Sequence, residues 1–131
     1  MKTVTPATIA VFEAMQKLEI LKIAKTEYLY QVDKGKTPNV CPLIVWAYRQ
    51  QTGEAIAPDN ESVTDCLYKK FPEMNAMRPK YAVYNGNWWI ITDVVSRIQL
   101  LDALIFKAKE KLTEICAKYD TKPPYPFDDC N

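Results

Sequence analysis

The stretch that decides the expected fold is KYAVYNGNWWIIT at residues 80–92, where two runs of aromatic and β-branched residues flank Asn85 and Gly86. An Asn-Gly pair is the strongest short-range sign of a two-residue β-hairpin, because a type I′ turn needs a positive φ at both central residues. Strand alternation then puts on one apolar face the side chains of Tyr81, Val83, Trp88 and Ile90. Because an isolated hairpin is marginally stable in water, the sequence predicts that this face packs on helices.

The composition is typical of a single globular domain. The chain has 131 residues, of which 48% are hydrophobic and 25% charged, and its formal net charge is +1. A chain of this size buries a core without metal or disulfide support, so residues 1–120 are expected to form one domain. No apolar run reaches the length of a membrane span, and residues 1–10 lack the apolar core of a signal peptide. These features predict a cytoplasmic protein without a membrane partner.

Residue types that carry enzymatic chemistry are sparse. The chain has no histidine, and its cysteines are scattered singly as Cys41, Cys66, Cys116 and Cys130. Thiols without a CxxC pair lack the usual spacing of a zinc site and are better explained as buried free thiols. No cysteine has an evident base nearby in the sequence, and the three glycines are too far apart for a phosphate-binding loop. The sequence therefore predicts a protein that is not an enzyme and holds no metal or cofactor.

A long helix is predicted near the start of the chain. Thr5 is suited to the N-cap position and Pro6 to the first helical position. An apolar stripe at helical spacing follows, formed by Val11, Phe12, Met15, Leu18 and Leu21. At residues 27–32 apolar and polar residues alternate, which favours a short strand, although the same residues also fit a continued helix.

Two shorter helices are predicted before the hairpin. Residues 41–51 form the first, which ends at Gly53, a residue suited to the left-handed conformation beyond a helix C-terminus. Residues 61–70 form the second, which Pro72 is expected to end.

The last predicted helix spans residues 93–119. Its apolar residues alternate steps of four and three: Val94, Ile98, Leu101, Ile105, Ala108, Leu112, Ile115 and Tyr119. This period of 3.5 residues is that of a coiled-coil seam. A helix of roughly 40 Å is longer than such a domain needs, which favours pairing with a second copy; burial of the seam within its own domain is the alternative. The following tail, TKPPYPFDDCN at residues 121–131, is expected to be an extended arm on a surface or a disordered end.

The order of predicted elements is helix, possible strand, helix, helix and hairpin. Over residues 5–92 this order resembles a winged helix-turn-helix domain, through Leu43, Ile44, Ala47, Thr52, Gly53, Val63, Leu67, Phe71 and the Asn85-Gly86 turn. The resemblance implies an α+β, mostly helical fold with a three-helix core, the hairpin as wing and a long C-terminal helix for dimerisation. It also implies a regulator of transcription or replication that binds DNA as a homodimer.

The resemblance further implies which residues touch DNA. They are Asn60, Ser62, Thr64, Lys69, Lys70, Arg78, Lys80, Asn85 and Asn87. The charge of this segment does not favour a polyanion, since residues 37–79 contain four basic and five acidic side chains. Phosphate neutralisation dominates DNA affinity, so lysines of the first or last helix would have to compensate. Those lysines are Lys17, Lys22, Lys25, Lys107, Lys109 and Lys111.

The alternative function is that of a protein-binding adaptor or inhibitor, a small regulatory factor of phage or plasmid type that uses the fold as a scaffold. Tryptophan and tyrosine are enriched at interaction hot spots, which makes Trp46, Tyr84 and Trp89 the candidate contact residues. The sequence also leaves open that the DNA-binding regulator senses a small apolar ligand held between the first and last helices.

Overall fold

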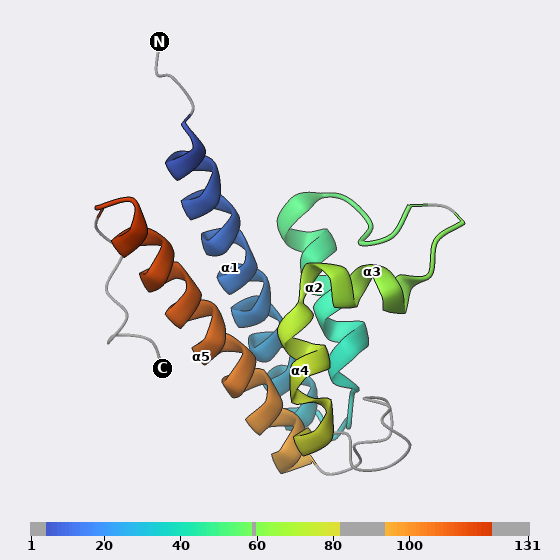
Figure 1. Cartoon of the computed structure of the whole chain (residues 1–131). Coiled ribbons are helices and arrows are strands. Elements are labelled where there is room, and N and C mark those ends of the chain that lie inside the picture. The colour runs from blue at the N-terminus through green and yellow to red at the C-terminus, as the bar shows by residue number, and fades with distance from the viewer. Residues whose placement is uncertain (1–4, 59, 82–93, 122–131) are drawn as a thin grey trace.

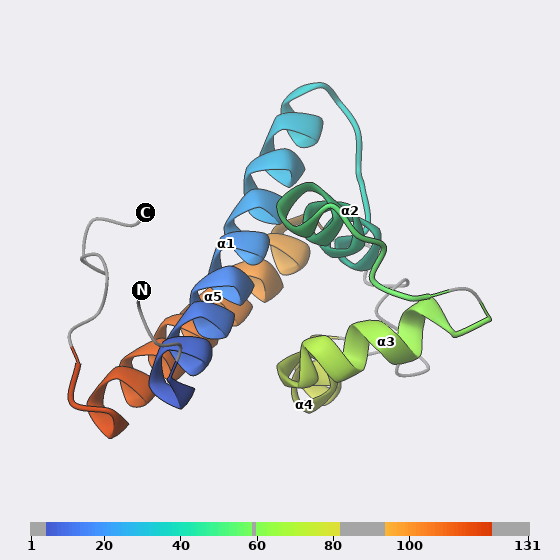
Figure 2. The same ribbon diagram turned by 90° about the horizontal axis from the view of Figure 1, so that it is seen from above.

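The described part of the chain is a five-helix protein. The computed structural model describes residues 5–58, 60–81 and 94–121, with 78–81 described by their backbone. The helices are α1 (Pro6–Asp33), α2 (Val40–Thr52), α3 (Val63–Lys70), α4 (Pro72–Tyr81) and α5 (Val94–Lys118). The long helices α1 and α5 pack side by side in opposite directions (Figure 1). Seen from above, α2, α3 and α4 all lie on one side of this pair (Figure 2).

The predicted α+β winged-helix fold is wrong, because the described residues contain helices and no strand. Residues 27–32, expected as a strand, continue α1. Tyr28 is fully buried on the same helical stripe as Leu21 and Ala24, so the continued helix adds a large aromatic side chain to the core. That burial outweighs the β propensity of the segment, which depends strongly on context.

The predicted hairpin falls largely outside the described residues. Residues 82–93 include Asn85 and Gly86, and the structure does not describe them. Lys80 and Tyr81, expected in the first strand, belong instead to the last turn of α4. The prediction that a helix ends before Pro72 is confirmed, since α3 ends at Lys70. The helix that contains Lys80 and Tyr81 begins at Pro72, which occupies a first helical position, where its missing N–H costs little.

The boundaries of α1 follow from capping. The prediction for its start is confirmed: the Thr5 hydroxyl accepts the backbone N–H of Thr8 at 3.1 Å, and Pro6 is the first helical residue. At the other end Gly35 has a φ of +84°. The N–H groups of Gly35 and Lys36 donate to the carbonyls of Val32 and Gln31, both at 2.9 Å, which is the Schellman arrangement.

The predictions for α2 and α5 are confirmed to within two residues. Gly53 follows α2 with a φ of +76°, and its N–H donates to the Arg49 carbonyl at 2.8 Å. Helix α5 starts at Val94 and ends at Lys118. Between them, the α3–α4 corner is formed by Phe71, whose side chain is only 2% exposed.

The main core lies where α1 and α5 meet and extends under α2. Its largest fully buried side chains include Leu18, Leu21, Ile44, Leu100, Leu101, Leu104 and Leu112. Arg97 is also buried, and its Nη1 donates to the carbonyl oxygens of Thr37 and Pro38, both at 2.9 Å. The start of α5 is thereby joined to the loop between α1 and α2.

Tyr28 gives the first testable prediction. Its hydroxyl is buried and has no hydrogen-bond partner among the described atoms. An unsatisfied buried hydroxyl costs stability, so Tyr28→Phe is expected to raise the free energy of unfolding by about 1 kcal/mol. Urea unfolding measures the change, with Tyr30→Phe as the matched control because Tyr30 is 58% exposed. A destabilised Tyr28→Phe protein would show instead that the hydroxyl has a hydrogen-bond partner.

Candidate functional site

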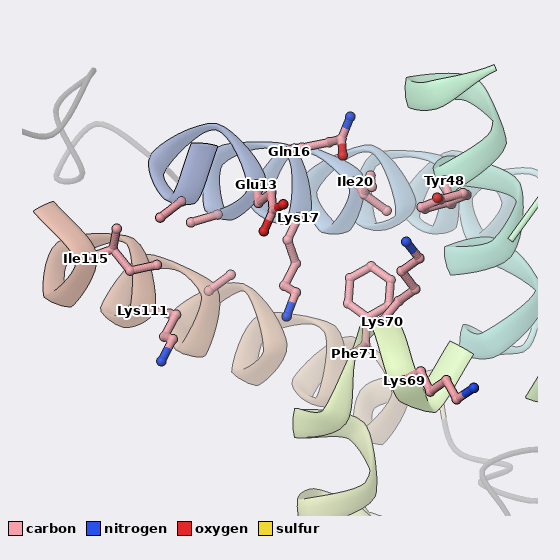
Figure 3. A pocket seen from close by; sticks show the side chains of 13 residues that line it. Glu13, Gln16, Lys17, Ile20, Tyr48, Lys69, Lys70, Phe71, Lys111 and Ile115 are labelled. Carbon is pink, nitrogen blue, oxygen red and sulfur yellow. The ribbon is translucent and has the colours of Figure 1, made fainter. Parts of the chain in front are cut away.

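A cavity of about 450 Å³ lies between the first half of α1, the second half of α5, the end of α2 and the α3–α4 corner. We call it the lysine groove. Its floor is apolar and is formed by Ala10, Ala14, Ile20, Phe71, Ala108 and Ile115. Its rim is charged and contains Glu13, Lys17, Lys69, Lys70 and Lys111. Four helices contribute to the groove, as the labelled side chains in Figure 3 show.

The charge of the rim is strongly positive. The lining contains four lysines and one glutamate, whereas the chain as a whole is close to neutral. Lys17 Nζ lies 3.4 Å from Glu73 Oε1, and both side chains are about one quarter exposed. Lys69 and Lys70 are exposed, as is Lys111. The groove therefore presents more positive charge than its own carboxylates neutralise.

Aromatic rings lie beneath two of the lysines. The Lys17 ammonium is 5.6 Å from the centroid of the Phe71 ring, and the Lys70 ammonium is 5.5 Å from that of Tyr48. Figure 3 shows the Lys70 side chain reaching toward Tyr48 and away from Lys69. Cation–π contacts of this length hold the lysine stems against apolar surface while the ammonium groups stay accessible.

A second cavity of about 690 Å³ adjoins the groove and shares Tyr48, Lys69 and Lys70 with it. Its other lining residues come mostly from the connector between α2 and α3 and include Glu54 and Glu61. The Cys66 thiol donates to Glu61 Oε2 at 3.2 Å, and this hydrogen bond is the first cause of the raised pKa of Cys66. Two carboxylates stand beside the two shared lysines here, so the lining of this second cavity carries no excess positive charge.

Two exposed apolar side chains stand beside the lysine groove. Ile9 is 48% exposed and Phe12 is 60% exposed. They lie one helical turn before Glu13 and Gln16, which line the groove, so the apolar surface of α1 continues over its edge.

The structure places two of the residues predicted to touch DNA at the lysine groove. Lys69 and Lys70 lie at the groove, whereas Ser62 caps α3 by accepting the Asp65 N–H at 3.3 Å. Asn60 is exposed with a φ of +72°, and Thr64 is half-buried. The backbones of Arg78 and Lys80 belong to α4, while Asn85 and Asn87 lie outside the described residues.

Six of the seven residues of the predicted dimer seam belong to the core of the same chain or pack against it. Leu101 and Leu112 are fully buried. The rest of the seam proposed for pairing is half-buried: Val94, Ile98, Ile105, Ile115 and Tyr119. Of the predicted protein-binding residues, Trp46 is 38% exposed on α2, and Tyr84 and Trp89 lie outside the described part of the chain.

Lys17 and Lys111 complete the groove. The sequence presents them only as lysines that would compensate for a weak DNA-binding charge, because nothing in a linear sequence brings these positions together. A helical wheel of α1 does place Lys17 beside the buried stripe of Ala14, Leu18 and Leu21. A lysine at the edge of an apolar face packs its stem on that face, and this position is the feature of the sequence that could have indicated a lysine of the groove.

Burial raises the pKa of the Cys41 thiol to about 12, so it stays protonated at neutral pH. In the described ranges no three His, Cys, Asp or Glu side chains are grouped as metal ligands. None of the five helices is long and apolar enough to cross a membrane. Comparisons of the chain with protein-family models, with curated proteins and with solved structures found no match.

Proposed function

We propose that the protein is a non-enzymatic regulator that binds an acidic, aromatic-bearing segment of a partner protein in the lysine groove. The observation that supports this is the combination of an apolar floor with a rim of four lysines and one glutamate. The proposal keeps the protein-binding function predicted from the sequence but moves it from the tryptophans to the groove. A cytoplasmic location and pairing of two copies stay predictions.

The apolar floor and the charged rim of the groove together favour an acidic ligand that carries aromatic side chains. The half-buried part of the floor, which includes Ala10 and Ile115, gains when aromatic or aliphatic side chains of a ligand cover it. The rim gains by meeting carboxylates, which also steer a partner of opposite charge during the encounter. A volume of about 450 Å³ is in the usual range of ligand pockets and accommodates a few side chains.

Duplex DNA is the competing ligand. Its phosphates suit the lysines, but a phosphate backbone offers nothing that the apolar floor would cover. The two ligands also differ in their response to salt, because each neutralised phosphate releases condensed counterions and steepens the salt dependence.

The binding test uses fluorescence anisotropy with the full chain. The probe is a labelled twelve-residue peptide with two Asp-Asp pairs and two phenylalanines. In one matched peptide every aspartate is replaced by lysine, and in another every phenylalanine is replaced by alanine. Random duplex DNA is the fourth ligand. We expect a Kd for the probe in the micromolar range and at least tenfold weaker binding of each altered peptide. Tighter binding of the duplex than of the probe, with a steep loss on adding salt, would establish the DNA-binding function instead.

Charge reversal in the groove supplies the matched variants. Lys17→Glu with Lys111→Glu is expected to weaken probe binding about tenfold, since each reversal of charge costs about 0.7 kcal/mol of binding free energy in total. The control is Lys36→Glu with Lys109→Glu, which changes the net charge equally, in the α1–α2 loop and on a residue of α5 that does not line the groove. Equal loss in both double variants would mean that the peptide responds to overall charge and not to the groove.

A further inference from the structure

We infer that the lysine groove also receives a segment of its own chain, residues 122–131 (KPPYPFDDCN), and that a partner must displace it. This inference rests on the ligand class of the proposed function. In the docked state Phe127 covers the apolar floor, and Asp128 and Asp129 meet the lysines of the rim.

The composition of the segment matches the groove. Within residues 122–131 the adjacent carboxylates of Asp128 and Asp129 directly follow Phe127, and Tyr125 stands two positions before it. The groove offers the complementary set, with Phe71 and Ile115 below and Lys17, Lys70 and Lys111 around them. The acidic residues of the segment therefore match the lysines of the groove, and its aromatic residues match the apolar floor.

The end of α5 is closed by a Schellman arrangement close to the start of α1 (Figures 1 and 2). Asp120 has a φ of +53°, and the N–H groups of Asp120 and Thr121 donate to the carbonyls of Ala117 and Cys116 at 3.2 and 2.8 Å. This Schellman arrangement ends the helix and turns the chain away from its axis. The end of α5 and the start of α1 lie next to each other in both views (Figures 1 and 2).

The reach of the segment is also sufficient. A return path along α5 from Thr121 passes Ile115 and Lys111 before Ala108, which lies about 20 Å away at 1.5 Å per helical residue. From Thr121 to Phe127 an extended chain at roughly 3.1 Å per residue spans about 19 Å. Phe127 and the two aspartates therefore reach the stretch of α5 that lines the groove.

Proline and the covalent connection both favour docking. Residues 122–131 contain Pro123, Pro124 and Pro126, which restrict φ and so lower the entropy lost when the segment is ordered. A short covalent connection gives a ligand an effective concentration on the order of millimolar. Contacts that would be weak between separate molecules are then enough to fill the groove.

Zero-length carbodiimide cross-linking of the full chain tests the contact, because it joins carboxylates to lysine amines that touch. An equal mixture of ¹⁵N-labelled and unlabelled protein separates links within a chain from links between chains. We expect Asp128 and Asp129 to link within one chain to Lys17, Lys70 or Lys111, and Phe127→Ala to lower the yield at least fivefold. The control is Phe106→Ala, which removes an aromatic side chain that is 59% exposed on α5 and does not line the groove.

The inference is overturned if the aspartates link equally to lysines far from the groove, such as Lys34 and Lys36, or if the links join labelled to unlabelled chains. Probe binding separates its failure from that of the proposed function. If the tail fills the groove, Asp128→Lys with Asp129→Lys binds the acidic probe about tenfold more tightly than the unaltered chain. If the double variant binds the probe with unchanged affinity and the aspartates form no cross-links to the groove lysines, the inference alone is refuted. If those cross-links form but the double variant does not bind the probe, the proposed function alone is refuted.

Discussion

Replacing Leu101 by alanine is expected to lower the free energy of unfolding by about 3 kcal/mol. Leu101 is fully buried where α5 packs on α1. Its removal forfeits the transfer energy of the lost methyl groups and leaves a cavity, which two packed helices close only in part. Urea unfolding followed by circular dichroism measures the loss.

The same variant tests where the apolar seam of α5 is covered. In the structure Leu101 and Leu112 are buried within one chain, so the loss in Leu101→Ala is expected to be the same at low and high protein concentration. If the seam joined two copies, the unfolding midpoint of the unaltered protein would rise with concentration by mass action, and Leu101→Ala would remove that dependence. Phe106→Ala, on the exposed face of the same helix, is the control and is expected to change stability by less than about 0.5 kcal/mol.

Arg97→Met is expected to destabilise the protein by about 3 kcal/mol, because it removes two charge-assisted hydrogen bonds while keeping an unbranched apolar stem. The lost bonds are those from Arg97 Nη1 to the carbonyls of Thr37 and Pro38, each 2.9 Å long. Because both acceptors lie between α1 and α2, the loop is also expected to become more susceptible to limited proteolysis.

Arg97→Lys serves as the conservative variant. It keeps the positive charge but replaces the planar guanidinium by a single ammonium on a different stem, so we expect it to recover only part of the stability. A loss below about 1 kcal/mol in Arg97→Met, with unchanged proteolysis at residues 34–39, would show that these bonds do not hold the loop.

The sequence was sufficient where local chemistry decides the structure. Thr5 and Pro6 fix the start of α1, and Gly53 fixes the end of α2, because capping depends on neighbours in the chain. It was insufficient where distant packing decides. Tyr28 satisfies both a strand pattern and a helix pattern, and only its burial under neighbouring helices selects the helix.

The same distinction applies to the candidate site. Lys69 and Lys70 were predicted to be functional, but for contact with phosphates beside a wing. Their observed neighbours, Lys17 and Lys111, come from helices at opposite ends of the described chain. Such a site depends on how four helices assemble, which residue spacing alone does not specify.

The pairing of α1 with α5 also has a kinetic consequence. Contacts in this pair, like the ion pair between Lys25 and Asp102, form between segments far apart in sequence, which slows folding relative to helical proteins built from local contacts. At a synthesis rate of roughly 5–20 residues per second, the apolar stripe of α1 waits several seconds on the ribosome for its partner. We therefore expect the nascent chain to be a client of ribosome-associated chaperones until α5 has emerged.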